Sequence, residues 1–267
     1  MPAPERLQLR IGCSGWQYKH WRGDFYPADV PATRWFEYYA ARFDTVELNV
    51  TFYRMPSSAT FRAWAARVPA GFVFAVKASR YLTHIRRLRE PKDPVDFLME
   101  RAGELGSHLG PILLQLPPDM PIDLDRLATT LDAFPSTVRI AFEPRHTSWF
   151  TDGLRALLTE RGVALCLADR RGPLMPPWRT ADWGYLRFHA GRARPASCYT
   201  EPALAAWAST TREQFGSSST VYAYFNNDHG GCALRDAAVF GRLLAGQGVE
   251  VARQPDVADD VLRLPRR

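Results

Sequence analysis

Eight short runs of apolar, aromatic and β-branched residues recur along the chain, and their length and composition predict β-strands. They cover residues 8–13, 45–53, 72–77, 111–116, 139–143, 164–169, 184–189 and 220–226. Between them lie stretches with helical periodicity, several of which open with Ser, Asp or Pro and end before Gly. These helices are predicted over residues 33–42, 57–67, 94–106, 123–134, 152–161, 201–215 and 235–247. Residues 170–182 contain four prolines or glycines and predict a loop or at best a short helix.

The alternation of strands and helices predicts a parallel sheet covered by helices. Eight strand–helix units within 267 residues suit closure into a single-domain TIM (β/α)8 barrel that spans residues 1–267. The main alternative is a doubly wound open sheet. The turn after the first strand argues against it, because it lacks the GxGxxG spacing of dinucleotide-binding folds and reads Gly12-Cys13-Ser14-Gly15-Trp16. We therefore expect the closed barrel.

Polar residues in five of the predicted strands share one face, because side chains alternate across a strand and residues two apart point the same way. The apolar residues between them would face the helices. The polar set comprises Glu47, Asn49 and Thr51, then Lys77, Gln115, Glu143 and Arg145, and finally Arg187 and His189. Most of them fall late in their strands, where the binding pocket of a barrel opens. We therefore expect Glu47, Lys77, Glu143, Arg187 and His189 to converge in one pocket.

A purely structural explanation of this pattern is a buried ion-pair network. In that network Glu47 would pair with Lys77, and Glu143 with Arg187. Charged side chains in a packed interior are costly unless they are paired. A barrel without a function at this end would not be expected to collect so many of them.

Further candidates lie just beyond the strand ends. His84 stands near Lys77, Arg80 and Thr83, although a loop histidine is more often a solvated surface residue than a ligand. Aromatic residues in these loops could form a stacking wall for a base or sugar, or could equally plug the mouth of the barrel. This group includes Trp16, Tyr53 and Trp149. Asn227, after the eighth strand, completes the predicted substrate-binding set.

Composition narrows the choice of partners and compartment. The chain has 34 basic and 28 acidic residues, and its net charge of +6 favours acidic partners. Its four cysteines, Cys13, Cys166, Cys198 and Cys232, are scattered without a CxxC pair, so we expect neither a zinc ribbon nor a disulfide framework, and a cytoplasmic location. No apolar run is long enough to span a membrane. Six histidines without HxH or HExxH do not support a multinuclear zinc centre.

An ordered set of short motifs runs through most of the chain. They are Ile11-Gly12-Cys13-Ser14-Gly15-Trp16, Glu47-Leu48-Asn49-Val50-Thr51-Phe52-Tyr53, Phe72-Val73-Phe74-Ala75-Val76-Lys77, Thr83-His84, Leu114-Gln115-Leu116-Pro117-Pro118, Glu143-Pro144-Arg145-His146 with Ser148-Trp149, Arg187-Phe188-His189, and Phe225-Asn226-Asn227-Asp228. In that order they resemble the YecE-like family, domain of unknown function 72, over residues 8–250. The resemblance implies a TIM barrel but no established reaction. One departure is Ala190, where the family tends to have Gly.

The leading functional hypothesis is a hydrolase or lyase acting on a phosphate-containing or nucleotide-like ligand. Lys77, Arg145, Arg187 and His189 would bind the anion, while Glu143 or Glu47 would serve as base. We expect no required cofactor, a small anionic ligand or nucleic acid as partner, no membrane association, and a monomeric chain.

Three alternatives stay open. The first is a carbohydrate-active enzyme with Glu47 and Glu143 as its acid and its base or nucleophile. The second is metal-dependent chemistry, with a single divalent cation held by Glu143, Asp169 and His189. The third is a phosphate- or nucleic-acid-binding module that anchors its ligand without catalysis.

Overall fold

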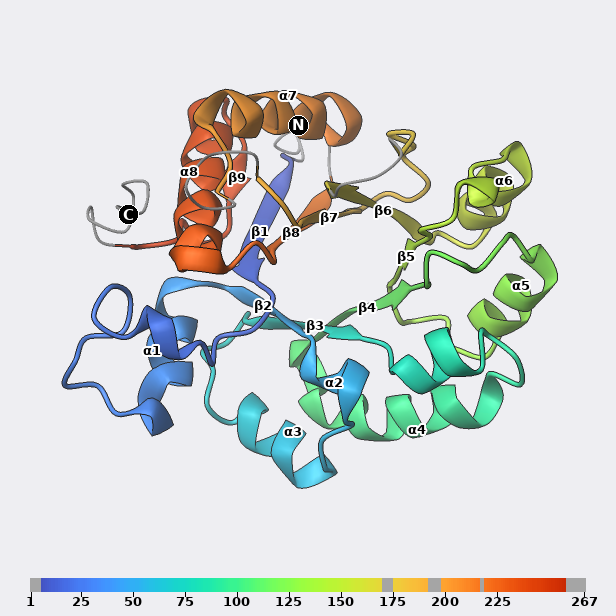
Figure 1. Ribbon diagram of the computed structural model, residues 1–267, viewed down its shortest axis with the longest axis horizontal. Helices are drawn as coiled ribbons and strands as arrows, with labels where there is room; N and C mark the ends of the chain where they lie inside the picture. The colour runs from blue at the N-terminus through green and yellow to red at the C-terminus, as the bar shows by residue number, and fades with distance from the viewer. Residues whose placement is uncertain (1–5, 170–174, 192–197, 217–218, 258–267) are drawn as a thin grey trace, which may run out of the picture. The chain divides into compact units, whose positions relative to one another are not determined.

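The computed structural model describes residues 6–169, 175–191, 198–216 and 219–257, and Figure 1 labels its elements. The strands are β1 (Gln8–Cys13), β2 (Thr45–Leu48), β3 (Val73–Lys77), β4 (Leu109–Gln115), β5 (Ile140–Glu143), β6 (Ala164–Asp169), β7 (Gly184–Phe188), β8 (Thr220–Phe225) and β9 (Glu250–Val251). The α-helices are α1 (Trp35–Arg42), α2 (Val50–Tyr53), α3 (Ser58–Ala65), α4 (Lys92–Ala102), α5 (Leu124–Asp132), α6 (Asp152–Glu160), α7 (Glu201–Phe215) and α8 (Cys232–Gly246). A π-helical turn covers Tyr81–Ile85, and 3-10 turns cover Lys19–Trp21, Ala32–Arg34, Gly103–His108, Thr147–Trp149 and His229–Gly231.

Side-chain caps fix the start of four of these helices. Ser57, Asp123, Thr151 and Thr200 each accept a backbone N–H from the first turn of the helix that follows. Such caps satisfy amide groups that have no partner within the helix. The helices therefore begin close to where the sequence places them.

The strand order overturns the expected closed barrel. Hydrogen-bonded neighbours follow the order β2-β3-β4-β5-β6-β7-β8-β1-β9, with β2 at one end and β9 at the other. A closed (β/α)8 barrel requires β1 to pair with β2. Among the described residues β1 instead pairs in parallel with β8 and β9. The protein has a mixed α/β fold with one sheet, and the described strand pairs of that sheet are parallel. The prediction of a TIM barrel is therefore wrong.

A tyrosine hydroxyl occupies the place where a β1–β2 ladder would form. The Tyr39 hydroxyl accepts the backbone N–H of Cys13 at 2.8 Å and donates to the Thr45 carbonyl at 3.0 Å. Gly12 permits this approach, because a Cβ there would lie 2.2 Å from the same carbonyl oxygen. Burial raises the pKa of Tyr39 well above its ordinary value, so the hydroxyl keeps the proton that it donates. One side chain thus satisfies two backbone groups that a strand ladder would otherwise pair.

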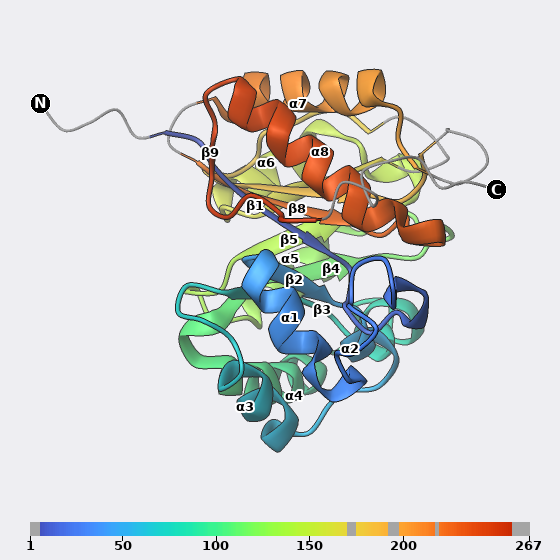
Figure 2. The ribbon, with the colours of Figure 1, turned by 90° about the vertical axis from the view of Figure 1, so that its left-hand side faces the viewer.

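The chain divides into two compact units. One comprises residues 1–46, 167–172 and 182–267, and the other comprises residues 47–166 and 173–181. In the first unit β7, β8, β1 and β9 pair in that order, and α7 and α8 pack against each other (Figure 2). In the second unit β3, β4 and β5 pair in order, and α3 packs on α4. The expectation of a single domain stays a prediction.

One predicted strand differs in the structure, and one short strand was not predicted. The second strand ends at Leu48 and gives way to α2 at Val50, so Asn49 and Thr51 do not share a strand face with Glu47. Strand β9 has only two residues and therefore carries no periodic signal in the sequence. The predicted loop of residues 170–182 shows no helix over residues 175–182, and residues 170–174 lie outside the described residues.

Cys198 and Cys232 form a disulfide, which corrects the expectation that the chain has none. The two residues are 34 positions apart and belong to no spacing motif, so only the fold brings them together. Cys13 and Cys166 are buried free thiols. Because disulfides are rare in reducing compartments, the cysteine pattern does not support the cytoplasmic location, which stays a prediction.

We expect Tyr39→Phe to lower the free energy of unfolding by about 2 to 4 kcal/mol, because it removes both hydrogen bonds that the hydroxyl makes with buried backbone groups. Urea denaturation followed by circular dichroism measures the loss. Tyr38→Phe is the matched control, since this neighbouring ring contacts the Arg42 guanidinium through its face. Equal losses in the two variants would contradict the bridging role of the Tyr39 hydroxyl.

Candidate functional site

The carboxyl ends of β3, β4 and β5 place three predicted site residues on one face of the sheet. Lys77 is the register partner of Leu113, and Gln115 is the partner of Glu143. Because residues two apart in a strand point the same way, Lys77, Gln115 and Glu143 share a face. Gln115 and Glu143 are buried, whereas Lys77 is half-buried. The unit built on residues 47–166 therefore brings these three together.

A short helix sets an aromatic ring beside Lys77. The Thr51 hydroxyl donates to the Lys77 carbonyl at 2.6 Å, which ties the start of α2 to the end of β3. The Lys77 ammonium lies 4.3 Å from the centroid of the Phe52 ring, within the range of a cation–π contact. The His84 ring meets Phe52 edge to face, with centroids 4.9 Å apart. Phe52 thus links the ammonium of Lys77 to the imidazole of His84.

Hydrogen bonding fixes the proton of neutral His84 on Nδ1. The Thr83 hydroxyl donates to the Ser79 carbonyl at 2.9 Å and also lies 2.9 Å from Nδ1 of His84. A hydroxyl has one proton, so Thr83 can only accept a hydrogen bond from the imidazole. Nε2 therefore carries the lone pair. The π-helical turn that holds both residues is a conformation often found at functional sites.

Positive charge surrounds the His84 imidazole. Its pKa falls from 6.5 to about 4, first because of burial and then because of the charges of Lys77, Arg145 and Arg80, while Asp119 acts in the opposite direction. At neutral pH the ring is therefore neutral. Three cations close enough to affect one imidazole form a region that favours an anionic ligand.

Glu143 and Glu47 are both fully buried carboxyl groups. Glu143 accepts a hydrogen bond from Nε of Arg145 at 3.1 Å, and Sγ of Cys166 lies 3.9 Å from its other oxygen. A buried carboxylate is tolerated when a cation pairs with it in this way. Glu143 therefore orients the Arg145 guanidinium, and the catalytic roles expected for Glu143 and Glu47 stay predictions.

Arg187 and His189 lie in the other unit, at the end of β7. Nη1 of Arg187 is 3.0 Å from Nε2 of His189, and the Asn226 side-chain amide is 3.1 Å from Nδ1. Arginine can only donate, so Nε2 of His189 accepts this hydrogen bond, and it is the amide nitrogen Nδ2 of Asn226 that lies beside Nδ1. The convergence of this pair with Lys77, Glu47 and Glu143 stays a prediction.

Asn227 contributes to a buried polar network of the first unit. Its amide nitrogen donates to Asp236 at 2.7 Å, and Asp236 also accepts from the backbone N–H of Tyr199 at 2.8 Å and from Arg235 at 2.5 Å. Burial raises the pKa of Asp236 to about 6 in spite of these donors. Asn227 thus anchors α8, a role that its place in the Asn226-Asn227-Asp228 motif did not indicate.

The aromatic candidate residues differ in how far their side chains are exposed to solvent. Trp149 is completely buried and its indole N–H donates to the Met120 carbonyl at 2.8 Å, while Trp16 is 5% exposed and stacks on Phe36 at 4.4 Å. Both rings are therefore buried in the core of the protein, and the stacking role expected for these two stays a prediction. Tyr53 is 80% exposed beside Phe52 and stays a candidate.

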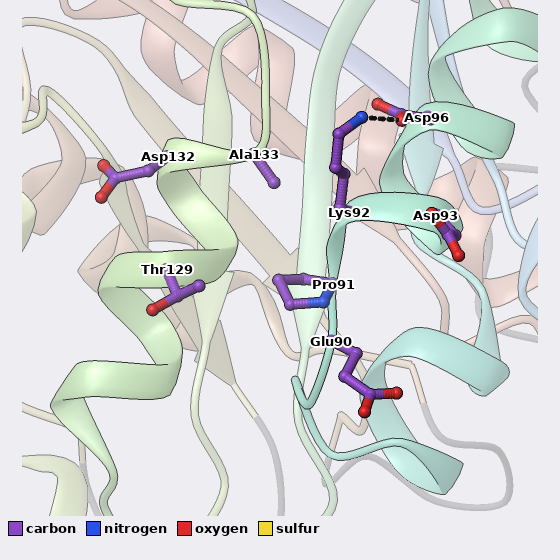
Figure 3. A pocket seen from close by; sticks show the side chains of 8 residues that line it. All are labelled: Glu90, Pro91, Lys92, Asp93, Asp96, Thr129, Asp132 and Ala133. Atoms are coloured by element: carbon purple, nitrogen blue, oxygen red, sulfur yellow. Dashed lines mark hydrogen bonds and ion pairs between the residues drawn. The ribbon is translucent and has the colours of Figure 1, made fainter.

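The pocket in Figure 3 lies between α4 and α5 and contains none of the predicted site residues. Its volume is 420 Å3. Three of its four carboxylates belong to surface ion pairs, which are Arg86 with Glu90, Lys92 with Asp96, and Arg161 with Asp132. Such pairs are typical of solvated helix surfaces. We do not regard this pocket as the functional site.

Within the described ranges, no three His, Cys, Asp or Glu side chains are grouped to hold a metal ion. No helix of those ranges is long and apolar enough to cross a membrane. The expectations about zinc and about a single divalent cation stay predictions.

These observations define a mixed α/β protein with a parallel sheet whose strand ends carry cationic and buried acidic side chains. The chain belongs to the DUF72 family, because the family model described as "Protein of unknown function DUF72" matches residues 10–259. This confirms the family that the ordered motifs resemble. A search of curated proteins finds no match.

Solved structures of the same family share this fold. A DUF72 family protein of Thermotoga maritima MSB8 is 26% identical with a TM-score of 0.80, and the match covers 89% of this chain and 99% of that one. A DUF72 family protein of Enterococcus faecalis V583 is 18% identical with a TM-score of 0.77, over 89% of this chain and 95% of that one. At 18% identity, the similarity to the Enterococcus faecalis protein shows only that the two chains share a fold.

We expect His84 to titrate with a midpoint near pH 4 in proton–carbon NMR spectra. Arg80→Gln should raise this midpoint, because it removes one nearby positive charge. Arg155→Gln, on the exposed face of α6, is the control and should leave the midpoint unchanged. Since the folded pKa lies below the unfolded value, His84 destabilises the fold as the pH falls from 6.5 to 4. A midpoint at the ordinary value of 6.5 would contradict the electrostatic description.

Asp236 should have the opposite pH dependence. Its folded pKa of about 6 exceeds the ordinary 3.8, so its contribution to stability is greatest below pH 3.8 and declines as the pH rises through 6. The stability advantage of the wild type over Asp236→Asn should therefore shrink between pH 4 and pH 6.5, by up to about 3 kcal/mol. Urea unfolding at several pH values measures this trend, and an advantage that grows with pH would refute it.

Proposed function

We propose that this protein binds a small phosphate-bearing ligand at a cationic cluster formed by Lys77, Arg80, His84 and Arg145, and acts on it as a hydrolase or lyase. The observation that carries the proposal is the grouping of three positive charges around one neutral imidazole at the strand ends. The exposed Tyr53 ring stands beside this cluster and would suit the organic part of a nucleotide-like ligand.

The cluster combines fixed and adaptable donors. Arg145 is oriented by its Nε contact with buried Glu143, and arginine donors suit phosphate oxygens in a planar, bidentate arrangement. Lys77 is held over Phe52 and supplies a point charge. Arg80 is exposed at the start of the π-helical turn, where it can meet a ligand that arrives from solvent. Together they favour a dianion over a neutral ligand.

His84 supplies the group that can move a proton. A bound phosphate would offset the neighbouring positive charges and raise the pKa of His84 towards the ordinary range, where imidazole exchanges protons readily. In hydrolysis of a phosphate ester, water would attack phosphorus and pass its proton to Nε2. The bond from phosphorus to the alcohol oxygen would break, and that oxygen would take the proton from the imidazolium.

Lys77→Met should weaken the binding of inorganic phosphate about 10- to 100-fold, because it removes a charge-assisted hydrogen bond of the site. Lys92→Met is the matched control: it makes the same change on α4, at a lysine side chain that is 80% exposed. Isothermal titration calorimetry of the two variants and the wild type measures the effect. Unchanged phosphate affinity in Lys77→Met would refute the proposed site.

The reaction needs a separate test. A panel of phosphate monoesters and nucleotides should include one that the wild type hydrolyses or cleaves and that His84→Gln does not, while His84→Gln still binds inorganic phosphate. If the wild type binds phosphate yet converts no member of the panel, the site is a binding module and the proposal of hydrolase or lyase activity is wrong. If neutral oligosaccharides bind and phosphate does not, the carbohydrate alternative replaces it.

A further inference from the structure

A second pocket lies in the unit that contains residues 182–267, and it is independent of the cationic cluster. Its volume is 300 Å3, which is the lower end of the range for small-molecule sites. It is lined by Asp169 at the end of β6, by Tyr199 and Thr200 before α7, by Trp207 on α7, and by the methyl groups of three alanines. One carboxylate, two aromatic rings and small apolar groups therefore surround the same space.

Neutral donors hold the Asp169 carboxylate in place. The indole N–H of Trp207 donates to it at 3.2 Å, and the Tyr199 hydroxyl donates to it as well. Burial, followed by the charge of Asp169, raises the pKa of Tyr199, so this hydroxyl keeps its proton. A carboxylate can accept about four hydrogen bonds, so two neutral donors leave capacity for further donors from a ligand.

Of the described residues that line the pocket, none is a cation that would balance the Asp169 charge. The residues around the pocket are one acid, two aromatic residues, a threonine and alanines. The start of α7 is also capped internally, because the Thr200 side chain accepts the backbone N–H of Ala203 at 3.4 Å. This cap reduces the attraction that a helix N-terminus offers to an anion. Among these described lining residues, the charged group is the Asp169 carboxylate.

The two aromatic walls are fixed from behind by a buried ring. Phe188 of β7 meets Tyr199 edge to face at 5.6 Å and Trp207 edge to face at 5.4 Å. The Tyr199 hydroxyl is held further by the backbone N–H of Ala190, which donates to it at 3.3 Å. A preformed wall loses little side-chain entropy when a ligand binds. The pocket is thus organised before any ligand arrives.

We propose that this pocket binds the ammonium group of a small organic amine, with Asp169 accepting its N–H bonds and Trp207 and Tyr199 lining its apolar part. A primary ammonium supplies both the positive charge and the donors that the carboxylate can still accept. Aromatic rings attract cations through their faces and accommodate an attached hydrocarbon group. The methyl side chains of the alanines leave room for that group.

The probe for this proposal is benzylammonium chloride, followed through the indole N–H signal of Trp207 in proton–nitrogen NMR spectra. Trp207→Phe assigns that signal among the eight tryptophans of the chain. We expect saturable shifts with benzylammonium and much weaker binding of benzyl alcohol, which lacks the charge. Methyl glucoside should not compete. Equal affinity for the alcohol, or tighter binding of the glucoside, would overturn the assignment to amines.

Two variants test the charge of the pocket and its free space separately. Asp169→Asn should weaken benzylammonium binding about tenfold or more, because it removes the negative charge. Asp24→Asn, at an exposed position of the same unit, is its charge-matched control. Ala206→Leu should abolish binding by filling the space, and Ala205→Leu makes the same change at a helix position that does not line the pocket.

The combined results decide the proposal even if Asp169→Asn fails to fold, because Ala206→Leu changes an exposed position of a helix and keeps a good helix former there. Loss of binding in Ala206→Leu but not in Ala205→Leu supports the pocket. Unchanged binding in Ala206→Leu, or the absence of any saturable shift with the wild type, refutes it.

Discussion

The hydroxyl of Tyr39 is the polar contact on which the first unit of this protein depends. Every buried backbone amide and carbonyl needs a partner, and the outer edge of a parallel strand offers many of them. Strand β1 is flanked by β8 on one side and by the short β9 on the other, and at its carboxyl end a single hydroxyl accepts from Cys13 and donates to Thr45. The absence of a side chain at Gly12 allows the two strands to approach. The end of β1, and the loop that follows it, is therefore positioned by a side chain of α1.

The same need for partners governs the charged residues in the interior. Arg10 pairs with Asp44, and Arg145 with Glu143, so each of these two buried carboxylates has a cation beside it. Burial still raises the pKa of Asp44 to about 6, which shows that the pairing does not fully offset desolvation. Around His84 the balance is reversed, because cations outnumber the acids that act on it. That local excess of positive charge is the feature on which the proposed binding of a phosphate-bearing ligand rests.

Local pattern was sufficient to predict much of the architecture. The predicted strands 8–13 and 164–169 and the predicted helix 201–215 coincide with β1, β6 and α7, because periodicity and capping are properties of neighbouring residues. The prediction of a closed barrel failed where the Tyr39 hydroxyl bonds to Cys13 and Thr45 in place of a β1–β2 ladder, and no periodicity in the sequence reports such a contact. The alternation through Tyr53 suggested a longer strand, yet the Thr51 hydroxyl bonds to the Lys77 carbonyl and α2 forms instead. Lys77, Gln115 and Glu143 share a face of the sheet, as the alternation of polar and apolar residues in their strands predicted. The burial of Trp149, in contrast, depends on contacts with residues distant in the sequence, such as Met120.

The Cys198–Cys232 bond closes a covalent ring around α7 and β8. Restricting a loop of 34 residues in the unfolded chain corresponds to about 4 kcal/mol of chain entropy. Tyr199, Thr200 and Trp207 all belong to this ring, so cleavage of the backbone between α7 and β8 would leave both pieces tethered. A nicked molecule would migrate as an intact chain until its thiols were reduced, and fragments would separate only then.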